Sequence, residues 1–267
     1  MNKRYFFISG LPRSGSSLLS ALLNQHPDIH ATATSGLLST LLGLRNTWEE
    51  RDEHRALTAS LSQVRKLSAM RGLAAHYHDD VDKPVILDKC RGWTAHIELA
   101  EAVFGGQIKI LCPVRDPRDI LASFEKIWRR NAATWQIPQE KNNPVKFATL
   151  AGRCEVWSAA DQPLGLAYNN LKDAAQRGYG DCLHFVSYEA LTTHPYETLM
   201  SVYHFLGLPA FDHDLESIEV VETEDDRAHG IPHLHDVAET VTTQAPQWPD
   251  ILGEELGKLY GGTDFWN

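Results

Sequence analysis

Glycine, serine and arginine residues are concentrated near the start of the chain, in the segment GLPRSGSS that begins at Gly10. Gly10 and Gly15 have the spacing of a phosphate-binding loop, and Ser17 stands at its hydroxyl position. Backbone amides in such a loop bind an anion together with the positive end of the following helix. Ser16 replaces the lysine of nucleotide-hydrolysing loops, so the nearest cation is Arg13. The segment predicts an anion site in which a guanidinium supplies the charge.

A second group of polar residues follows the apolar run IKILCPV, in the segment VRDPRDILASF. Arg115 ends the run and Ser123 follows eight residues later. We expect Asp116 to cap a helix that has Pro117 at its first position. Ser123 then lies two turns along, on the same face as the cap, where it and Arg115 can reach one phosphate. The alternative for Arg115 is an ordinary ion pair with a neighbouring carboxylate.

The elements that position these residues are apolar runs alternating with helical periodicity. RYFFIS precedes the glycine loop, and PVILDK, IKILCPV and LHFVSY have the composition of buried parallel strands. Helical spacing is found in SSLLSALLNQ, in TAHIELAEAVF and in the segment from Pro195 to Gly207. The order predicts a single α/β domain over residues 1–267, a P-loop-like doubly wound parallel sheet flanked by helices. Ligands of such sheets bind at the carboxyl ends of the strands.

The composition excludes several classes of protein. A formal net charge of −10 argues against a nucleic-acid-binding surface. No run of about 18 apolar residues is present, so we expect no membrane span. The four cysteines are widely spaced and form no C-x-x-C pair, which is typical of reduced thiols and indicates a cytoplasmic protein. They are Cys90, Cys112, Cys154 and Cys182.

The two polar segments resemble the donor-binding motifs of the sulfotransferases that use 3′-phosphoadenylyl sulfate (PAPS), closest to the bacterial and tyrosylprotein branches. SGLPRSGSSLL resembles their 5′-phosphosulfate loop, and VRDPRDILASF resembles their 3′-phosphate motif. The resemblance implies PAPS as donor and adenosine 3′,5′-bisphosphate (PAP) as product, with no metal, and Arg13 as catalytic cation. The donor contacts that it implies are Arg13, Ser14, Gly15, Ser16, Ser17, Arg115 and Ser123.

Two further positions match the same family. Lys89, in LDKCRG, corresponds to a sulfate-contacting lysine of the tyrosylprotein sulfotransferases, and Tyr188, in VSYEAL, to a residue that contacts the nucleotide. A strand-end lysine and a packed tyrosine stay open as alternatives. On this basis residues 4–130 and 183–209 form the donor-binding core, and residues 36–80 and 131–180 a helical region on the acceptor side.

The general base is the missing part of the motif set. Tyrosylprotein sulfotransferases carry a catalytic glutamate shortly after the first helix, whereas HATATSGLL offers Thr34 and no carboxylate. A base must come within hydrogen-bond reach of the acceptor proton. Asp88 is the first candidate because it stands beside Lys89. The other candidates are His30, His96 and His233.

Residues 212–267 are expected to form an irregular C-terminal region. Its segment EDDRAHGIPHLHD is rich in acidic residues and histidines, but Gly230 and Pro232 indicate a loop rather than a helix with facing metal ligands. We expect this loop to close over the donor, with Arg227 as a contact of the 3′-phosphate. The histidine-rich cluster consists of His229, His233, His235 and Asp236.

The sequence therefore predicts an enzyme, a sulfotransferase that moves a sulfuryl group from PAPS to a hydroxyl or amine. Two alternatives stay open. A P-loop phosphotransferase would need a compensating lysine and a carboxylate for magnesium, and a non-catalytic binder of PAP would explain the missing base. The sequence does not identify the acceptor, which can be a sugar, a lipid, a peptide tyrosine or a small metabolite. It also leaves open whether the chain forms a homodimer.

Overall fold

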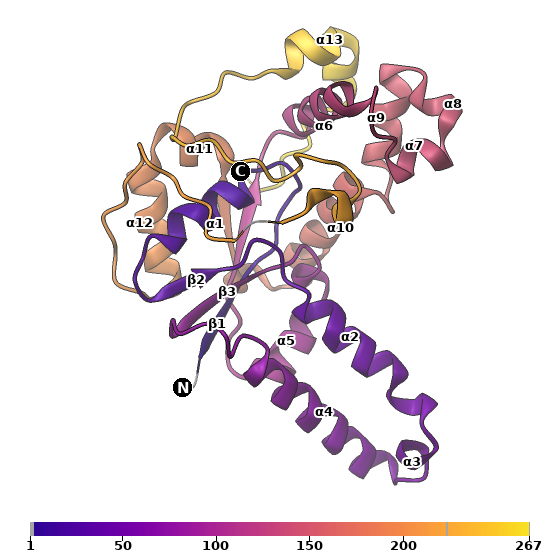
Figure 1. Cartoon of the computed structure of the whole chain (residues 1–267), viewed down its shortest axis with the longest axis vertical. Helices are drawn as coiled ribbons and strands as arrows, with labels where there is room; N and C mark the ends of the chain where they lie inside the picture. The colour runs from indigo at the N-terminus through magenta and orange to yellow at the C-terminus, as the bar shows by residue number, and fades with distance from the viewer. Residues whose placement is uncertain (1–2, 223, 267) are drawn as a thin grey trace.

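A five-stranded parallel sheet forms the centre of the protein in the computed structural model, which describes residues 3–222 and 224–266 (Figure 1). The strand order is β2-β3-β1-β4-β5, and every neighbouring pair is parallel. The predicted doubly wound sheet is confirmed. β2 is absent from the sequence prediction because its three residues are too few to show a period. The strands are β1 (Arg4–Ile8), β2 (Ile29–Ala31), β3 (Val85–Lys89), β4 (Ile110–Val114) and β5 (Leu183–Ser187).

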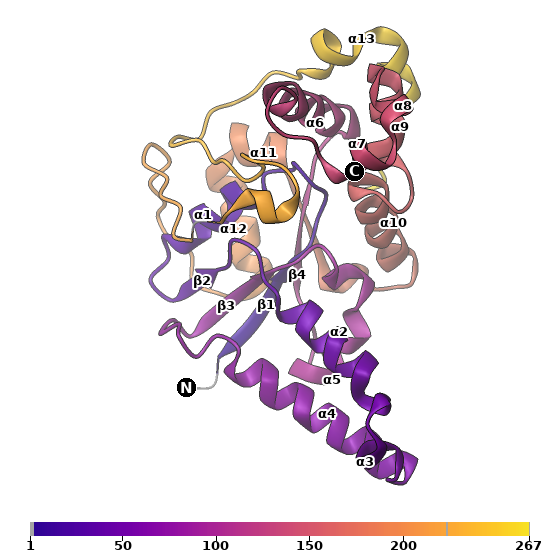
Figure 2. The ribbon, with the colours of Figure 1, turned by 45° about the vertical axis from the view of Figure 1, so that its right-hand side comes forward.

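Alternating side chains of the central strand enter two separate hydrophobic cores. Phe7 packs into one core, and Phe6 and Ile8 pack into the other. Helices therefore cover both faces of the sheet (Figure 2). One face carries α1 (Ser16–Asn24), α11 (Tyr188–Thr193) and α12 (Pro195–Leu206). The other carries α5 (Ile97–Phe104), α6 (Pro117–Asn131), α9 (Leu150–Ser158) and α10 (Pro163–Gln176).

The connection between β2 and β3 is a helical hairpin that extends beyond the sheet (Figures 1 and 2). Within residues 48–73, apolar residues at helical spacing, among them Leu61, Val64 and Met70, predict amphipathic helices that cover the sheet. Leu61 and Val64 are instead 40% and 60% exposed, and Met70 reaches the core. The prediction is wrong for the outer half, because an 18-residue helix is about 27 Å long and exceeds the strands beside it. The hairpin comprises α2 (Leu37–Thr47), η1 (Trp48–Glu50), α3 (Asp52–Arg55) and α4 (Ala59–His76).

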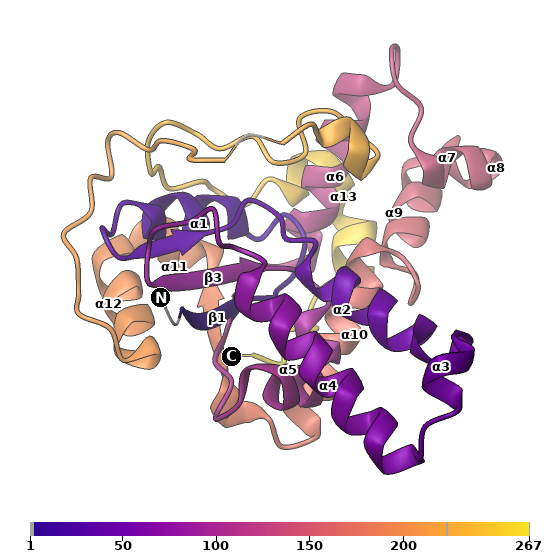
Figure 3. The ribbon, with the colours of Figure 1, turned by 60° about the horizontal axis from the view of Figure 1, so that its bottom comes forward.

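After α12 the chain runs back over the α1 side of the sheet as a long loop, residues 207–247, here called the C-terminal loop (Figure 3). It contains the short helix η4 (Asp226–His229) and leads to α13 (Trp248–Leu259), which packs against α6. The prediction of an irregular C-terminal region is thus wrong for residues 248–259, which form α13. Gly253, at φ 75° and ψ 175°, divides this helix into pieces too short to show a helical period.

The remaining helical elements are short. Within the described residues, no helix is both long enough and apolar enough to cross a membrane. These elements are η2 (Trp93–Ala95), α7 (Pro138–Asn142), α8 (Pro144–Phe147) and η3 (Gly180–Cys182).

Candidate donor-binding site

The glycine loop follows β1 at the carboxyl end of the sheet and is fixed to the neighbouring strand β4. A Cβ atom at Gly10 would lie 2.2 Å from the carbonyl oxygen of Pro113, so only glycine allows this approach. The buried Ser14 hydroxyl donates to the Leu11 carbonyl at 2.6 Å and lies 2.9 Å from the Pro113 carbonyl oxygen. The Ser14 side chain therefore holds the loop, which leaves its backbone amide for a ligand.

The loop turns into α1 through two residues with left-handed backbone. Gly15 has φ 81° and caps α1 without a side chain, so the first amides of the helix have no side-chain partner from the cap. Arg13 has φ 57°, which is uncommon for a residue with a Cβ atom. Such strain is concentrated at binding and catalytic sites, where the surrounding structure enforces it. The backbone here is shaped to present amides and a guanidinium together.

Arg115, at the end of β4, lies against this loop rather than in an ion pair. Its Nη1 donates to the Arg13 carbonyl at 3.4 Å, and its guanidinium stacks 4.2 Å from the centre of the Tyr188 ring. Within the described residues its Nε is buried and has no hydrogen-bond partner. A buried guanidinium N–H without a partner is costly, and an anionic ligand would satisfy it.

The carboxylates near Arg115 are engaged elsewhere. Asp116 caps α6 as predicted and pairs with Arg118 at 2.5 Å. Asp119 accepts the backbone N–H groups of Gln247 and Trp248, which ties α6 to the start of α13. Glu125 is fully buried and pairs with Arg153 at 2.7 Å. The ion-pair alternative for Arg115 therefore finds no support.

The two motifs are joined by direct contacts. Arg13 Nε donates to the Ser123 hydroxyl at 3.0 Å, and its Nη1 donates to the carbonyl of Leu234 in the C-terminal loop. The Tyr188 ring lies so close to Gly15 that a Cβ there would be 2.6 Å from it. Residues that are between 110 and 221 positions apart in the sequence thus form one site.

Three predicted cations, Arg13, Lys89 and Arg115, meet at this site, and Arg13 and Lys89 are desolvated. Burial and the neighbouring charge of Arg115 lower the pKa of Arg13 to about 10. Burial lowers the pKa of Lys89, at the end of β3, to about 8. The Lys89 ammonium lies 3.3 Å from the Ser17 hydroxyl, beside the start of α1. A bound anion would favour the charged forms, so the site is built for negative charge.

A cleft of about 390 Å³ opens over these groups. Of the predicted donor contacts, Ser14 and Ser123 do not line the cleft. Ser123 instead accepts a hydrogen bond from Arg13, which does line it. Arg227 lies exposed on η4 and does not line the cleft, so the structure gives no support to it as a phosphate contact. Predicted residues that line the cleft are Arg13, Gly15, Ser16, Ser17, Lys89, Arg115 and Tyr188.

Asp88, the first candidate for the general base, does not face the cleft. Its side chain is fully buried, and its oxygens accept hydrogen bonds from Trp93 Nε1 at 2.7 Å and from the Ser35 hydroxyl. His78 Nε2 lies 3.3 Å away. This environment makes Asp88 a buried structural anchor, and the geometry does not fit a base that meets an acceptor.

The three candidate histidines also have other surroundings. His30 is buried and pairs with Glu222 at 2.9 Å. His96 precedes α5 and does not line the cleft. His233 has an exposed side chain that lies 3.3 Å from Asp236. None of the three sits beside Lys89 in the cleft.

The C-terminal loop instead brings residues that the sequence prediction did not name as base candidates. The Thr34 hydroxyl donates to Glu224 at 3.0 Å, and His235 Nδ1 lies 2.6 Å from Asp226. His229 and His235 both line the cleft. In the sequence, acidic residues and histidines alternate around Gly230 and Pro232, which indicates a polar loop. Only the folded chain shows which of these acidic residues and histidines line the cleft.

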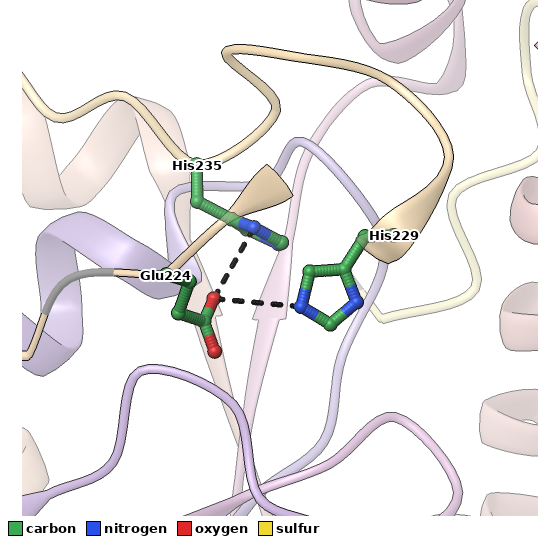
Figure 4. Close-up of side chains that lie close together, drawn as sticks. All are labelled: Glu224, His229 and His235. Carbon is green, nitrogen blue, oxygen red and sulfur yellow. Dashed lines mark ion pairs between the residues drawn. The ribbon is translucent and has the colours of Figure 1, made fainter. Parts of the chain in front are cut away.

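Figure 4 shows Glu224, His229 and His235 pointing toward one another. Their ligand-type atoms lie within 4.8 Å of one another. The Glu224 carboxylate is 3.4 Å from His235 Nδ1 and 3.8 Å from His229 Nε2. His235 Nδ1 already donates to Asp226, so hydrogen bonding inside the loop accounts for this cluster without a metal.

A parallel sheet with a glycine loop after its central strand, and with a second cation at the end of the next strand, defines a nucleotide-binding α/β protein of the P-loop class. Residues 6–213 match the model of the sulfotransferase family, and the chain belongs to that family. The resemblance of the two motifs is thereby confirmed at the level of the family.

Two curated relatives are nodulation proteins. NoeE of Sinorhizobium fredii is 29% identical over 219 residues, which are 75% of this chain and 49% of NoeE. Nodulation protein H of Rhizobium tropici is 24% identical over 215 residues, covering 77% of this chain and 76% of that protein. Protein-tyrosine sulfotransferase A of Caenorhabditis elegans is 33% identical over 49 residues, 18% of this chain and 13% of that protein. The chain therefore spans about half of NoeE.

Solved structures show the same fold. The sulfotransferase domain from the curacin biosynthetic pathway has a TM-score of 0.58 at 17% identity and covers 96% of this chain and 99% of that domain. The corresponding domain of the Synechococcus olefin synthase has a TM-score of 0.51 at 18% identity, with coverages of 95% and 96%. At this identity the likeness concerns the fold alone.

Proposed function

We propose that this chain transfers the sulfuryl group of PAPS to a hydroxyl or amine of an acceptor and releases PAP. The observation that carries the proposal is Arg115, whose guanidinium lies against the glycine loop and whose buried Nε has no hydrogen-bond partner within the described residues. One anion site on the loop and a second at Arg115 match a nucleotide with phosphates at both its 5′ and 3′ positions.

The described residues divide into two groups by role. The amides at the start of α1, with Ser16 and Ser17, would hold the 5′-phosphosulfate, because a helix start attracts anions. Arg115 and Ser123 would hold the 3′-phosphate, and Tyr188 would contact the nucleotide. These contacts exist before and during the reaction, so they supply binding.

Arg13 and Lys89 would act on the sulfuryl group in transit. The acceptor atom forms a bond to sulfur while the bond from sulfur to the bridging oxygen breaks, and that electron pair leaves with the 5′-phosphate of PAP. Fixed cations lower the energy of this state because its charge is spread over the sulfuryl oxygens and the leaving oxygen. The acceptor also loses a proton, which requires a base.

The direct test is transfer of sulfur-labelled PAPS to pooled acceptors, with one pool each of sugars, lipids, tyrosine peptides and small phenols or amines. We expect label in at least one pool and an equal amount of PAP. Arg13→Ala should slow the transfer by about 10²- to 10³-fold, whereas Arg118→Ala, a cation of α6 paired with Asp116, should retain it. If PAP binds but no pool gains label, the chain is a binder of PAP and the proposal fails.

A further inference from the structure

Thr34 stands where tyrosylprotein sulfotransferases carry their catalytic glutamate, and here it contacts the C-terminal loop. Thr34 donates its hydroxyl proton to Glu224 at 3.0 Å, so the loop is held against the segment that follows β2. Leu234, in the same loop, accepts a hydrogen bond from the guanidinium of Arg13. His235 follows Leu234 and lines the same cleft as Arg13.

The loop is closed at its base by main-chain hydrogen bonds. The Ile218 N–H donates to the Glu239 carbonyl at 2.8 Å, and the Val241 N–H donates to the Leu215 carbonyl at 2.9 Å. These two hydrogen bonds join the chain that leads to His235 with the chain that leads away from it. A side chain on this segment is positioned by the fold rather than by chance contacts of a free loop.

Asp226 fixes the His235 ring through two hydrogen bonds. Its Oδ1 accepts from His235 Nδ1 at 2.6 Å, and its Oδ2 accepts from the His235 backbone N–H at 3.0 Å. A carboxylate on one ring nitrogen holds the proton there and leaves the other nitrogen with a lone pair. The arrangement is that of an imidazole base with an orienting carboxylate, which recurs on unrelated folds.

His235 lies where two cavities meet. It lines the cleft and also a side cavity of about 220 Å³ between α1, β2 and the C-terminal loop. Ser17 and Lys89 line both cavities as well. Displacement at sulfur requires the acceptor and the leaving group on opposite sides, so a residue shared by both cavities is suited to meet an acceptor beside the sulfuryl group.

The groups that face His235 come from three elements. Burial and the Lys89 charge from β3 lower the pKa of His235, whereas Asp226 and Glu224 raise it, and the first two effects prevail. The His229 ring of η4 lies 5.3 Å from the His235 ring. A lowered pKa leaves the imidazole neutral near pH 7, which is the form that can accept a proton.

We propose that His235 is the general base of the sulfuryl transfer, and that Asp226 is its positioning residue. The proposal rests on the function proposed above. His235 Nε2 takes the proton of the acceptor O–H or N–H, the freed electron pair forms the bond to sulfur, and the bond to the bridging oxygen breaks with its pair on PAP. The proton ends on His235 and is then released to water.

The test compares kcat for labelled PAPS and the pooled acceptors in matched variants. His235→Ala should lower kcat by about 10²- to 10⁴-fold, the usual contribution of a base. His233→Ala, an exposed histidine two residues away, should retain the wild-type rate. PAP should still raise the melting temperature of His235→Ala, which shows that the fold and donor site persist. Wild-type kcat in His235→Ala would overturn the assignment, and so would a larger loss in Glu224→Gln than in His235→Ala.

A nuclear magnetic resonance titration of imidazole nitrogens in the PAP-bound protein needs no acceptor. We expect His235 with its proton on Nδ1, and a loss of that tautomer preference in Asp226→Asn. A proton on Nε2 in the neutral ring would contradict the proposal. If the wild type transfers no label at all, the proposed function fails. If the wild type transfers label and His235→Ala does so at the same rate, only the assignment of the base fails.

Discussion

Arg13 combines a strained backbone with a partly desolvated guanidinium, and we propose that it acts on the sulfuryl group in transit rather than in nucleotide binding. We predict that Arg13→Ala lowers kcat by about 10²- to 10³-fold, as removal of one group that stabilises developing charge does. The dissociation constant of PAP should change by less than about tenfold, or about 1.4 kcal/mol. Steady-state kinetics and calorimetry with PAP measure the two effects. Near-normal turnover would remove Arg13 from the mechanism.

Arg115 should behave in the opposite way, because its proposed contact with the 3′-phosphate would be present in the ground state and the transition state alike. We predict that Arg115→Ala raises the KM for PAPS by about 10- to 150-fold, which corresponds to a charge-assisted bond of about 1.5 to 3 kcal/mol. Arg118→Ala is the matched control, since Arg118 pairs with Asp116 and stacks 4.3 Å from the Trp248 ring. Equal wild-type affinity for nucleotides with and without a 3′-phosphate would refute this role.

We expect Lys89 to make the proposed reaction depend on pH. Burial lowers its pKa to about 8, so the ammonium charge is lost as the pH rises through that value. We predict that kcat/KM for PAPS, which reports groups of the free enzyme, falls above about pH 8. Lys89→Arg should move this limb to higher pH because arginine stays charged. A wild-type profile that is flat through about pH 9 would show that the charge of Lys89 is not needed.

The sequence predicts the residues that line the donor cleft, whereas it does not point to His235, the base proposed above. Gly10, Gly15 and Ser17 lie in one short segment, and local spacing defines their geometry. His235 and Asp226 come near the donor loop only when the C-terminal loop folds over α1. Such a long-range contact produces no periodic pattern in the local sequence. Asp88 illustrates the same limit, since its neighbour Lys89 faces the cleft while Asp88 points into the core.

At the scale of elements, the glycine loop depends on its close contact with β4. We predict that Gly10→Ala destabilises the protein by about 1 to 3 kcal/mol, because its Cβ would overlap backbone atoms of Pro113 that cannot move aside. Gly72→Ala is the matched control, since Gly72 lies inside α4 with open space around it. It should stabilise the protein by about 0.5 to 1 kcal/mol. Thermal unfolding of both variants checks the signs, and a stable Gly10→Ala would contradict the packing account.

Elements with strong local signals were predicted well. α12 begins at Pro195 and ends before Gly207, whose φ is 68°, as the sequence indicates. β2 and α13 lacked such signals, the first because it is short and the second because Gly253 interrupts it. α4 was identified as a helix, but amphipathic spacing does not reveal how far a helix extends past the sheet that it accompanies.

For the whole molecule, a net charge of −10 surrounds a site that gathers three cations. The sheet explains how this is achieved. β1, β3 and β4 are adjacent, so the residues at their carboxyl ends converge although they are far apart in the chain. Arg13, Lys89 and Arg115 stand in or after these strands. The negative net charge disfavours polyanions in general, while the local positive field would suit one doubly phosphorylated nucleotide.

The central claim is that the glycine loop and Arg115 together bind one nucleotide through its 5′ and 3′ phosphates, and thermal unfolding with two ligands tests it most directly. PAP without magnesium, at about 100 times its dissociation constant, should add about 2.7 kcal/mol of stability. In a chain of this size each kcal/mol raises the melting temperature by roughly 2 to 4 °C, so we predict a rise of about 5 to 10 °C. ATP with magnesium should give a smaller rise, because it lacks the 3′-phosphate and the loop carries Ser16 in place of a lysine. A larger rise with ATP and magnesium, and none with PAP, would contradict the account and favour a phosphotransferase.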